Sequence, residues 1–227
     1  MTFYALALVL AGILSFSDYI TENFFSKQLR ESKKIISFSG GVGISYVVLN
    51  LFPEISSYSL INGRAVFLYV LAGFVSLNLI EQFIYKEVKK INSYHKGVHI
   101  TYFFVYKFLI GMVLASFASE GLTQTMLFFI PFLLYIIAEI LPQEFDFKSK
   151  TFKVFYTMAP LFGAVFGIQY LEFVNSIFGP LISLITGTLL YIVIRESLPS
   201  DKAEKPIYFL IGVISYSLVI FMSWNFF

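Results

Sequence analysis

The chain lacks cysteine altogether and has only two histidines among its 227 residues. Without cysteine there are no disulfide bonds, no thiolate metal ligands and no cysteine-based catalysis. The sequence also has no glycine-rich phosphate loop, no nucleophile elbow and no Ser/His/Asp set. We therefore expect that the protein is not an enzyme and that it carries no cofactor.

Charged residues are scarce as well. They make up 13% of the chain, against 58% hydrophobic residues, and the mean hydropathy is +0.79. These values lie far outside the range of soluble domains. The spacers between apolar stretches are short and contain no Pro-, Gly- or Ser-rich linker. The composition predicts a polytopic membrane protein that forms one transmembrane domain over residues 1–227, with the lipid bilayer as its main partner.

Apolar stretches of about 18 to 22 residues recur along the whole chain, and at 1.5 Å per residue each can cross a hydrocarbon core of roughly 30 Å as a helix. The sequence therefore predicts an all-α fold with eight transmembrane helices. We place them at 3–22, 35–55, 66–85, 98–118, 122–142, 154–174, 177–194 and 206–226.

Basic residues provide an independent test of this segmentation, because Lys and Arg gather in cytoplasmic loops. Loops one, three, five and seven hold nearly all of them, whereas the opposite side has only Arg64. Both termini are thus expected to face away from the cytoplasm. We expect the protein in the cell membrane, which is the cytoplasmic (inner) membrane if the host is bacterial. The formal net charge of +2 reflects this topology, and no nucleic-acid partner is expected.

Lys107 stands near the middle of the predicted fourth helix, within the apolar stretch VHITYFFVYKFLIGMVLASF. A lysine at the centre of a membrane helix costs roughly 2.5 to 3.5 kcal/mol on insertion scales. Its side chain should therefore face protein, water or an acidic partner. The identity of that partner becomes the main question about function.

His95 and His99 lie four residues apart in the segment INSYHKGVH. Residues at this spacing share a helix face and could bind a metal together. Two neutral ligands on a basic loop, without a third, make a weak site. Ordinary interfacial histidines are the simpler interpretation.

Four motifs resemble those of the ZRT/IRT-like (ZIP) metal transporters. The second helix has a Gly-Val start and a Leu-Phe-Pro-Glu ending, with Asn50 at the position of a family histidine. The third helix has Glu81 at the family's characteristic glutamate, and the sixth and seventh match its Gly-Ala and Gly-Thr-x-Leu-Tyr patterns. The four motifs lie, in the family's order, in 41–54, 71–87, 158–167 and 185–200.

The resemblance implies a ZIP-like 3+2+3 bundle of eight helices. In it, helices one to three and six to eight form an inverted repeat that encloses helices four and five. The related endings of the second and seventh helices, Leu-Phe-Pro-Glu and Ser-Leu-Pro-Ser, point in opposite directions, which suits such a repeat. A homodimer is an open alternative for the assembly.

The family works through a metal centre between its fourth and fifth helices, and there this sequence departs from the pattern. Glu139 keeps a family ligand, but ligands or their neighbours are lost at Tyr106, Lys107, Ile110, Ala138 and Pro142. Zinc or iron needs about three or four donors, and a charged ammonium offers no lone pair. A degenerate metal site is therefore expected, and a bound divalent metal is disfavoured.

Glu139 is then the natural partner for Lys107, because the equivalent family positions converge on one site. Our hypothesis is that a Lys107–Glu139 ion pair stands where the metals would be. Neutralising Glu139 should destabilise the protein, and also removing Lys107 should rescue it.

Three functions remain open at the level of sequence. The first is a ZIP-like transport protein that moves another small solute or protons. The second is a working zinc, iron or manganese transporter with a rearranged, weaker site. The third is a non-transporting scaffold or regulator in which the charge pair plugs the old route. The weak metal candidates are Glu139, Glu81, Asn50, Asp18, His95 and His99.

Overall fold

A computed structural model describes residues 2–21, 33–86, 93–138, 150–197 and 206–226. Nearly all of these residues are helical and none of them lies in a strand. The prediction of an all-α protein is therefore confirmed.

The described helices follow the predicted segments closely. The first half of the chain contains α1 (Thr2–Ile20), α3 (Lys33–Tyr46), the π-helical turn η2 (Val47–Leu51), α4 (Phe52–Asn62), α5 (Val66–Lys86) and α6 (Ser93–Glu120). The second half contains α7 (Leu122–Ala138), α8 (Lys150–Thr157), α9 (Ala159–Gln169), α10 (Leu171–Ser176), α11 (Phe178–Ile192), the π-helical turn η4 (Val193–Ser197) and α12 (Pro206–Phe226).

Among the described residues, five helical stretches are long and apolar enough to cross a membrane. They are Phe3–Ile20, Lys33–Ile61, Gly97–Glu120, Phe178–Arg195 and Pro206–Trp224. A sixth forms if α8 and α9, which meet at a bend of 46°, are one span. The remaining two apolar helices, Val66–Gln82 and Leu122–Ala138, are shorter. The structure thus has five or six candidate spans where the sequence predicted eight.

Two prolines account for two of the differences between the helices and the predicted segments. The second helix runs on to Asn62, because the Phe52 N–H donates to the Val47 carbonyl in the wide turn η2. That turn lets the helix pass Pro53, which has no N–H to donate. The sixth helix is broken instead, since Pro160 in the first turn of α9 cannot hydrogen-bond to the preceding turn.

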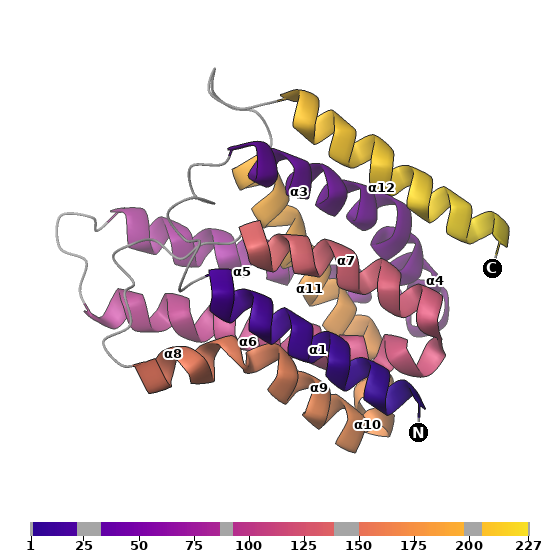
Figure 1. Cartoon of the computed structure of the whole chain (residues 1–227), viewed down its shortest axis with the longest axis horizontal. Helices are drawn as coiled ribbons and strands as arrows, with labels where there is room; N and C mark the ends of the chain where they lie inside the picture. Colours follow the sequence, from indigo (N-terminus) through magenta and orange to yellow (C-terminus); the bar gives the residue numbers. More distant parts are fainter. Residues whose placement is uncertain (1, 22–32, 87–92, 139–149, 198–205, 227) are drawn as a thin grey trace.

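The two chain termini lie at the same end of the bundle (Figure 1). The helices α1, α5, α7 and η4 end, and α3, α6, α8 and α12 begin, at the opposite end. We call the first the terminal end and the second the basic end. The basic end takes its name from described residues at these helix ends: Lys33, Lys34, Lys86, Lys150, Lys153 and Arg195.

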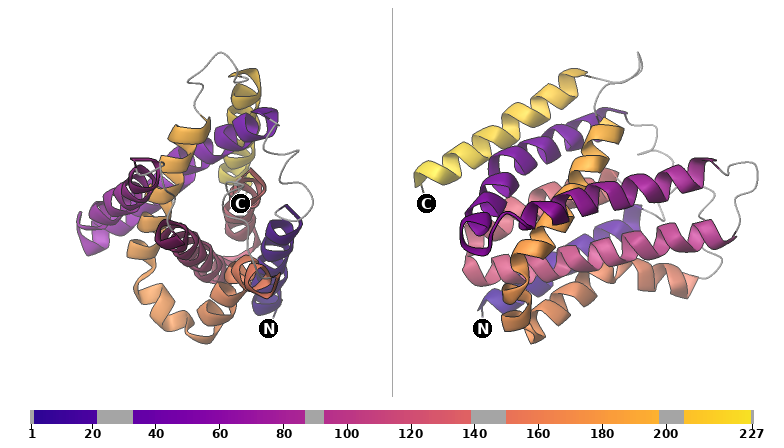
Figure 2. Two further views of the ribbon diagram at one scale, coloured as in Figure 1. Left: turned by 90° about the vertical axis from the view of Figure 1, so that its left-hand side faces the viewer. Right: turned by 180° about the vertical axis from the view of Figure 1, so that it is seen from behind.

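Three helix pairs pack most closely: α3 with α12, α5 with α11, and α6 with α9 (Figures 1 and 2). Glycine lies on both sides of each contact. A Cβ atom at any of these glycines would overlap a backbone carbonyl oxygen of the neighbouring helix. The close approach therefore depends on having no side chain there, as is common between membrane helices. The pairs are Gly41 with Gly212, Gly73 with Gly187, and Gly111 with Gly163.

Large apolar side chains cover the outside of the bundle, most of all on α1 and α12. Phe16 on α1 is 63% exposed, and α12 buries only 17% of its most apolar window. Such a surface is expected to face lipid. The buried core lies between α3, α6, α7 and α11 and is rich in aromatic rings, including Tyr46, Phe128 and Phe132.

Candidate functional site

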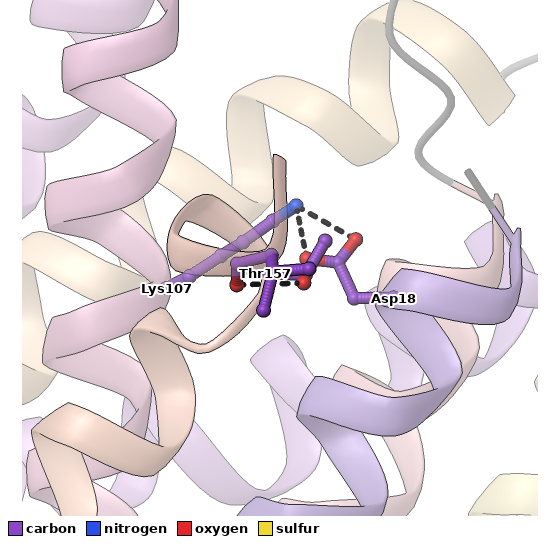
Figure 3. Close-up of polar contacts among 4 residues, drawn as sticks. Asp18, Lys107 and Thr157 are labelled. Atoms are coloured by element: carbon purple, nitrogen blue, oxygen red, sulfur yellow. Dashed lines mark hydrogen bonds and ion pairs between the residues drawn. The ribbon is translucent and has the colours of Figure 1, made fainter. Parts of the chain in front are cut away.

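Lys107 is fully buried, with 1% of its surface exposed, and it faces an equally buried carboxylate. Its Nζ atom donates hydrogen bonds of 3.0 Å to both Oδ1 and Oδ2 of Asp18 on α1 (Figure 3). A buried ammonium and a buried carboxylate each carry a desolvation cost of several kcal/mol, which only close pairing offsets. The ion pair therefore holds α1 and α6 together, because separating the two side chains would leave each buried charge unpaired.

Helix direction explains how Lys107 reaches Asp18. Lys107 lies near the middle of α6, whereas Asp18 is close to the end of α1. Side chains lean toward the N-terminus of their own helix, and α6 begins at the basic end, where α1 ends. The long lysine side chain therefore extends toward the basic end, and the pair lies in that half of the bundle.

The broken sixth helix supplies the rest of the surroundings. The Lys107 Nζ lies 4.6 Å from the centre of the Tyr156 ring, within cation–π range. The neighbouring Thr157 is also buried beside the pair (Figure 3), and its hydroxyl donates to the Val154 carbonyl over 3.1 Å. The break at Pro160 thus places the end of α8 against the ion pair.

Ser15 connects the same break to α1. It lies one turn before Asp18 and is buried, and its Oγ accepts a 3.2 Å hydrogen bond from the Leu161 N–H. The first N–H groups of a helix have no partner within that helix. Ser15 satisfies one of them in α9, so α1 holds both the ion pair and the start of the second half of the broken helix.

The predicted partner Glu139 lies outside the described residues, as does Pro142. The described partner of Lys107 is Asp18, which the sequence suggested only as a weak metal ligand. The family resemblance could not point to Asp18, because the metal centre that it implies lies between the fourth and fifth helices. The signal was present in another form: Asp18 is an acidic residue within the predicted first apolar segment, 3–22.

Three other residues predicted for the central site lie in or beside the packed core. The Tyr106 hydroxyl donates to the Ile185 carbonyl over 3.5 Å, and its ring meets that of Tyr135 edge-on. Ile110 is completely buried in the core. Ala138, at the described end of α7, lines a cavity of about 20 Å³ between α3, α7 and α11. That volume holds about one water molecule.

The two histidines are not brought together into a described metal site. His99 is buried, and its ring lies 4.5 Å from that of Phe103. His95 lies in α6, but its side chain is outside the described part of the structure. In the residues that the structure describes, no three His, Cys, Asp or Glu side chains gather closely enough to hold a metal ion.

Glu81 takes part in a second ion pair at the basic end. It is 9% exposed, and its Oε2 pairs with Nη1 of Arg195 in η4. The same oxygen accepts a 2.8 Å hydrogen bond from the Tyr191 hydroxyl. This cluster joins α5 to α11 and η4. Sequence reasoning singled out Glu81 but missed Arg195, which was counted only as a loop charge.

Asn50 lies far from the ion pairs, in the π-helical turn η2, and lines a pocket of about 340 Å³ at the terminal end. The pocket lies between η2, the turn from α6 to α7, and the end of α12. Glu120 and Gln124 also line it. Asn50 and Glu81, which the sequence analysis names as weak metal candidates, therefore lie at opposite ends of the bundle.

The central arrangement favours protons over metal ions. Both Asp18 oxygens face an ammonium group, which repels cations and offers no lone pair while charged. A buried lysine–carboxylate pair is neutral overall, and moving its partners apart forces a change in protonation because an isolated buried charge is costly. Such a pair can therefore take up or release a proton when α1 moves relative to α6.

Compared with protein-family models and with curated proteins, the chain matches none. The likeness to ZIP transporters thus remains a prediction based on four sequence motifs.

Proposed function

We propose that the protein is a multi-pass membrane transport protein with a ZIP-like arrangement, in which the Lys107–Asp18 pair occupies the central site and transfers protons. The observation that supports this most strongly is the pair itself. Both side chains are at most 1% exposed and lie between membrane-length helices. Ionisable residues within membrane helices are costly and are found mostly on ion pathways and proton relays.

A repeat of opposite orientation is supported by the helix contacts. In the predicted repeat, helices one to three correspond to helices six to eight, so the second helix (α3) corresponds to the seventh (α11) and the third (α5) to the eighth (α12). The contact of α3 with α12 is then equivalent to the contact of α11 with α5. Both contacts are among the most extensive in the bundle, and both rely on facing glycines. This correspondence is expected of an inverted repeat.

The two π-helical turns support the same repeat. The turn η2 leads into the Leu51-Phe52-Pro53 sequence of the second helix, and η4 ends at Ser197, directly before Leu198-Pro199. Short π-helical turns are rare in proteins as a whole, and those that occur are often found at functional sites. Their occurrence at matching points of the second and seventh helices favours eight spans over the five or six that length and composition alone identify.

Proton flux through reconstituted liposomes tests the proposal. A pH gradient is imposed across proteoliposomes that contain a trapped pH-sensitive dye. We expect the parent protein to dissipate the gradient faster than empty liposomes, and Asp18→Asn and Lys107→Met to abolish the difference. Glu172→Gln, in the first turn of α10, is the matched control and should behave like the parent.

The two alternative functions give different results in the same liposomes. Uptake of radiolabelled zinc, iron or manganese by the parent protein would replace our proposal with a metal transporter that has a rearranged site. Metal uptake by Lys107→Asn alone would indicate that the pair plugs a metal route. A folded parent protein that moves neither protons nor metals would contradict both proton and metal transport and favour a scaffold or regulator.

A further inference from the structure

The pocket at the terminal end has the size and lining of a ligand site that is separate from the central pair. Its volume of about 340 Å³ falls at the lower end of the range for small-molecule sites. Asn50 and Gln124 provide amide groups, Ser223 a hydroxyl, and Leu127 an apolar wall. Asn50 itself lies in a π-helical turn, and such turns are often found at functional sites.

One negative charge dominates this pocket. Among the described residues that line it, Glu120 alone is charged. No ion pair or hydrogen bond of the Glu120 side chain is formed within the described part of the chain. The Glu120 carboxylate therefore has no basic partner among the described residues of the lining, and it is suited to bind a cation.

The lining disfavours a bare metal ion. Magnesium and calcium prefer about six or more oxygen ligands, usually with several carboxylates, and zinc prefers histidine or cysteine. In the described part of the chain, no three His, Cys, Asp or Glu side chains lie close enough together to hold a metal ion. A single carboxylate with amide and hydroxyl neighbours instead suits a monovalent cation that donates few hydrogen bonds.

An aromatic ring at the rim narrows the class of ligand further. Trp224 on α12 lines the pocket and remains 58% exposed, so its indole face is accessible. Tryptophan is the best partner for cation–π contacts, and quaternary ammonium groups are the typical ligands for such contacts. Leu122 and Leu127 add apolar surface for the alkyl part of a ligand.

We propose that the pocket formed by Asn50, Glu120, Gln124, Ser223 and Trp224 binds a small organic ammonium ion. The carboxylate neutralises the charge, the indole ring covers one face of the cation, and the apolar wall contacts its alkyl groups. This site stands apart from the proposed transport function, because binding at the terminal end requires no movement of the Lys107–Asp18 pair.

The absence of native cysteine allows a direct test. Thr123→Cys introduces a single thiol into the pocket lining. Purified protein is reacted with two thiosulfonate reagents of similar size, one bearing trimethylammonium and one bearing sulfonate. After correction for their rates with a free thiol, we expect the cationic reagent to react about tenfold faster, and tetramethylammonium to slow both. Equal corrected rates without protection by tetramethylammonium would overturn the proposal.

Second variants assign the effect to particular side chains. Glu120→Gln in the same background should remove the preference for the cationic reagent, whereas Glu172→Gln, on α10, should retain it. Trp224→Leu should weaken protection by tetramethylammonium. Protection that survives both Glu120→Gln and Trp224→Leu would contradict this assignment of the site.

Two further measurements distinguish an ammonium site from an anion or metal site, and from the central pair. Protection of the thiol by acetate or by magnesium, with none by tetramethylammonium, would show an anion or metal site instead. Tetramethylammonium should still protect the thiol in Asp18→Asn, which is expected to lose proton flux. The failure of one proposal is thereby distinguishable from the failure of the other.

Discussion

The two ends of the bundle treat charge in opposite ways. Toward the basic end, acidic side chains are closed off by basic partners: Asp18 by Lys107, and Glu81 by Arg195. At the terminal end, Glu120 lines a pocket of about 340 Å³, and no basic residue is among the described residues around it. The described acidic side chains are thus paired toward the basic end, whereas at the terminal end a carboxylate lines an open pocket, as the proposed ammonium site requires.

The largest effect is expected from opening the buried pair. Asp18→Asn removes the carboxylate that pairs with the Lys107 ammonium, and breaking a buried ion pair typically costs about 3–5 kcal/mol. We expect a strong fall in the free energy of unfolding, measured by denaturation in detergent micelles. Glu172→Gln, the control on α10, should unfold like the parent. An unchanged free energy of unfolding in Asp18→Asn would remove the contrast between the two ends.

A smaller loss is expected from the glycine contact that sets α9 against α6. A Cβ at Gly163 would overlap the Phe108 carbonyl oxygen, and overpacking of this kind costs about 1–3 kcal/mol. Gly163→Ala should therefore lower the unfolding temperature. At Gly12 a Cβ meets nothing within 4 Å, so Gly12→Ala should be neutral or slightly stabilising. Equal effects of the two substitutions would show that the close approach is not needed.

The second ion pair should contribute less than the first. The Arg195 side chain is 33% exposed, so water and salt screen its attraction to Glu81. We expect Glu81→Gln to cost roughly 1 kcal/mol, and the loss to shrink in high salt. The loss in Asp18→Asn should change little with salt, because that pair is fully buried. A salt-independent loss in Glu81→Gln would mean that the second pair is as shielded as the first.

The smallest effect on stability is expected at the terminal end. Glu120 is exposed and its side chain has no ion pair within the described residues, so Glu120→Gln should change the free energy of unfolding by less than about 0.5 kcal/mol. The same substitution should remove the preference for cations in the pocket. A large loss of stability in Glu120→Gln would instead assign this carboxylate a structural role.

The helical segments could be predicted well because membrane helices leave a simple signal. Each predicted segment is a long apolar run, and α12 begins and ends at the predicted residues 206 and 226. The break in the sixth helix was less accessible. Pro160 has no N–H and leaves a carbonyl of the preceding turn without its donor. Whether the helix bends there, and by how much, depends on the neighbouring groups that hydrogen-bond to that carbonyl.

The described partner of Lys107, Asp18, could not be predicted by extending a family motif. The position of Lys107 within an apolar segment predicts the energetic cost of its charge but not the direction in which its side chain extends. The lean of side chains toward the start of α6, together with the antiparallel run of α1, leads to Asp18. The pocket at the terminal end left no local signal, since Asn50, Glu120 and Ser223 come from three separate segments.

The central claim is that Lys107 and Asp18 form one neutral unit, and a double-mutant cycle tests it most directly. The free energy of unfolding is measured for Lys107→Met, Asp18→Asn and the double variant. It is also measured for Glu139→Gln in the parent protein and in Lys107→Met. We expect each single substitution to cost about 3–5 kcal/mol and the double variant to recover most of that loss. Additive losses at Asp18, or rescue of Glu139→Gln by Lys107→Met instead, would contradict the account.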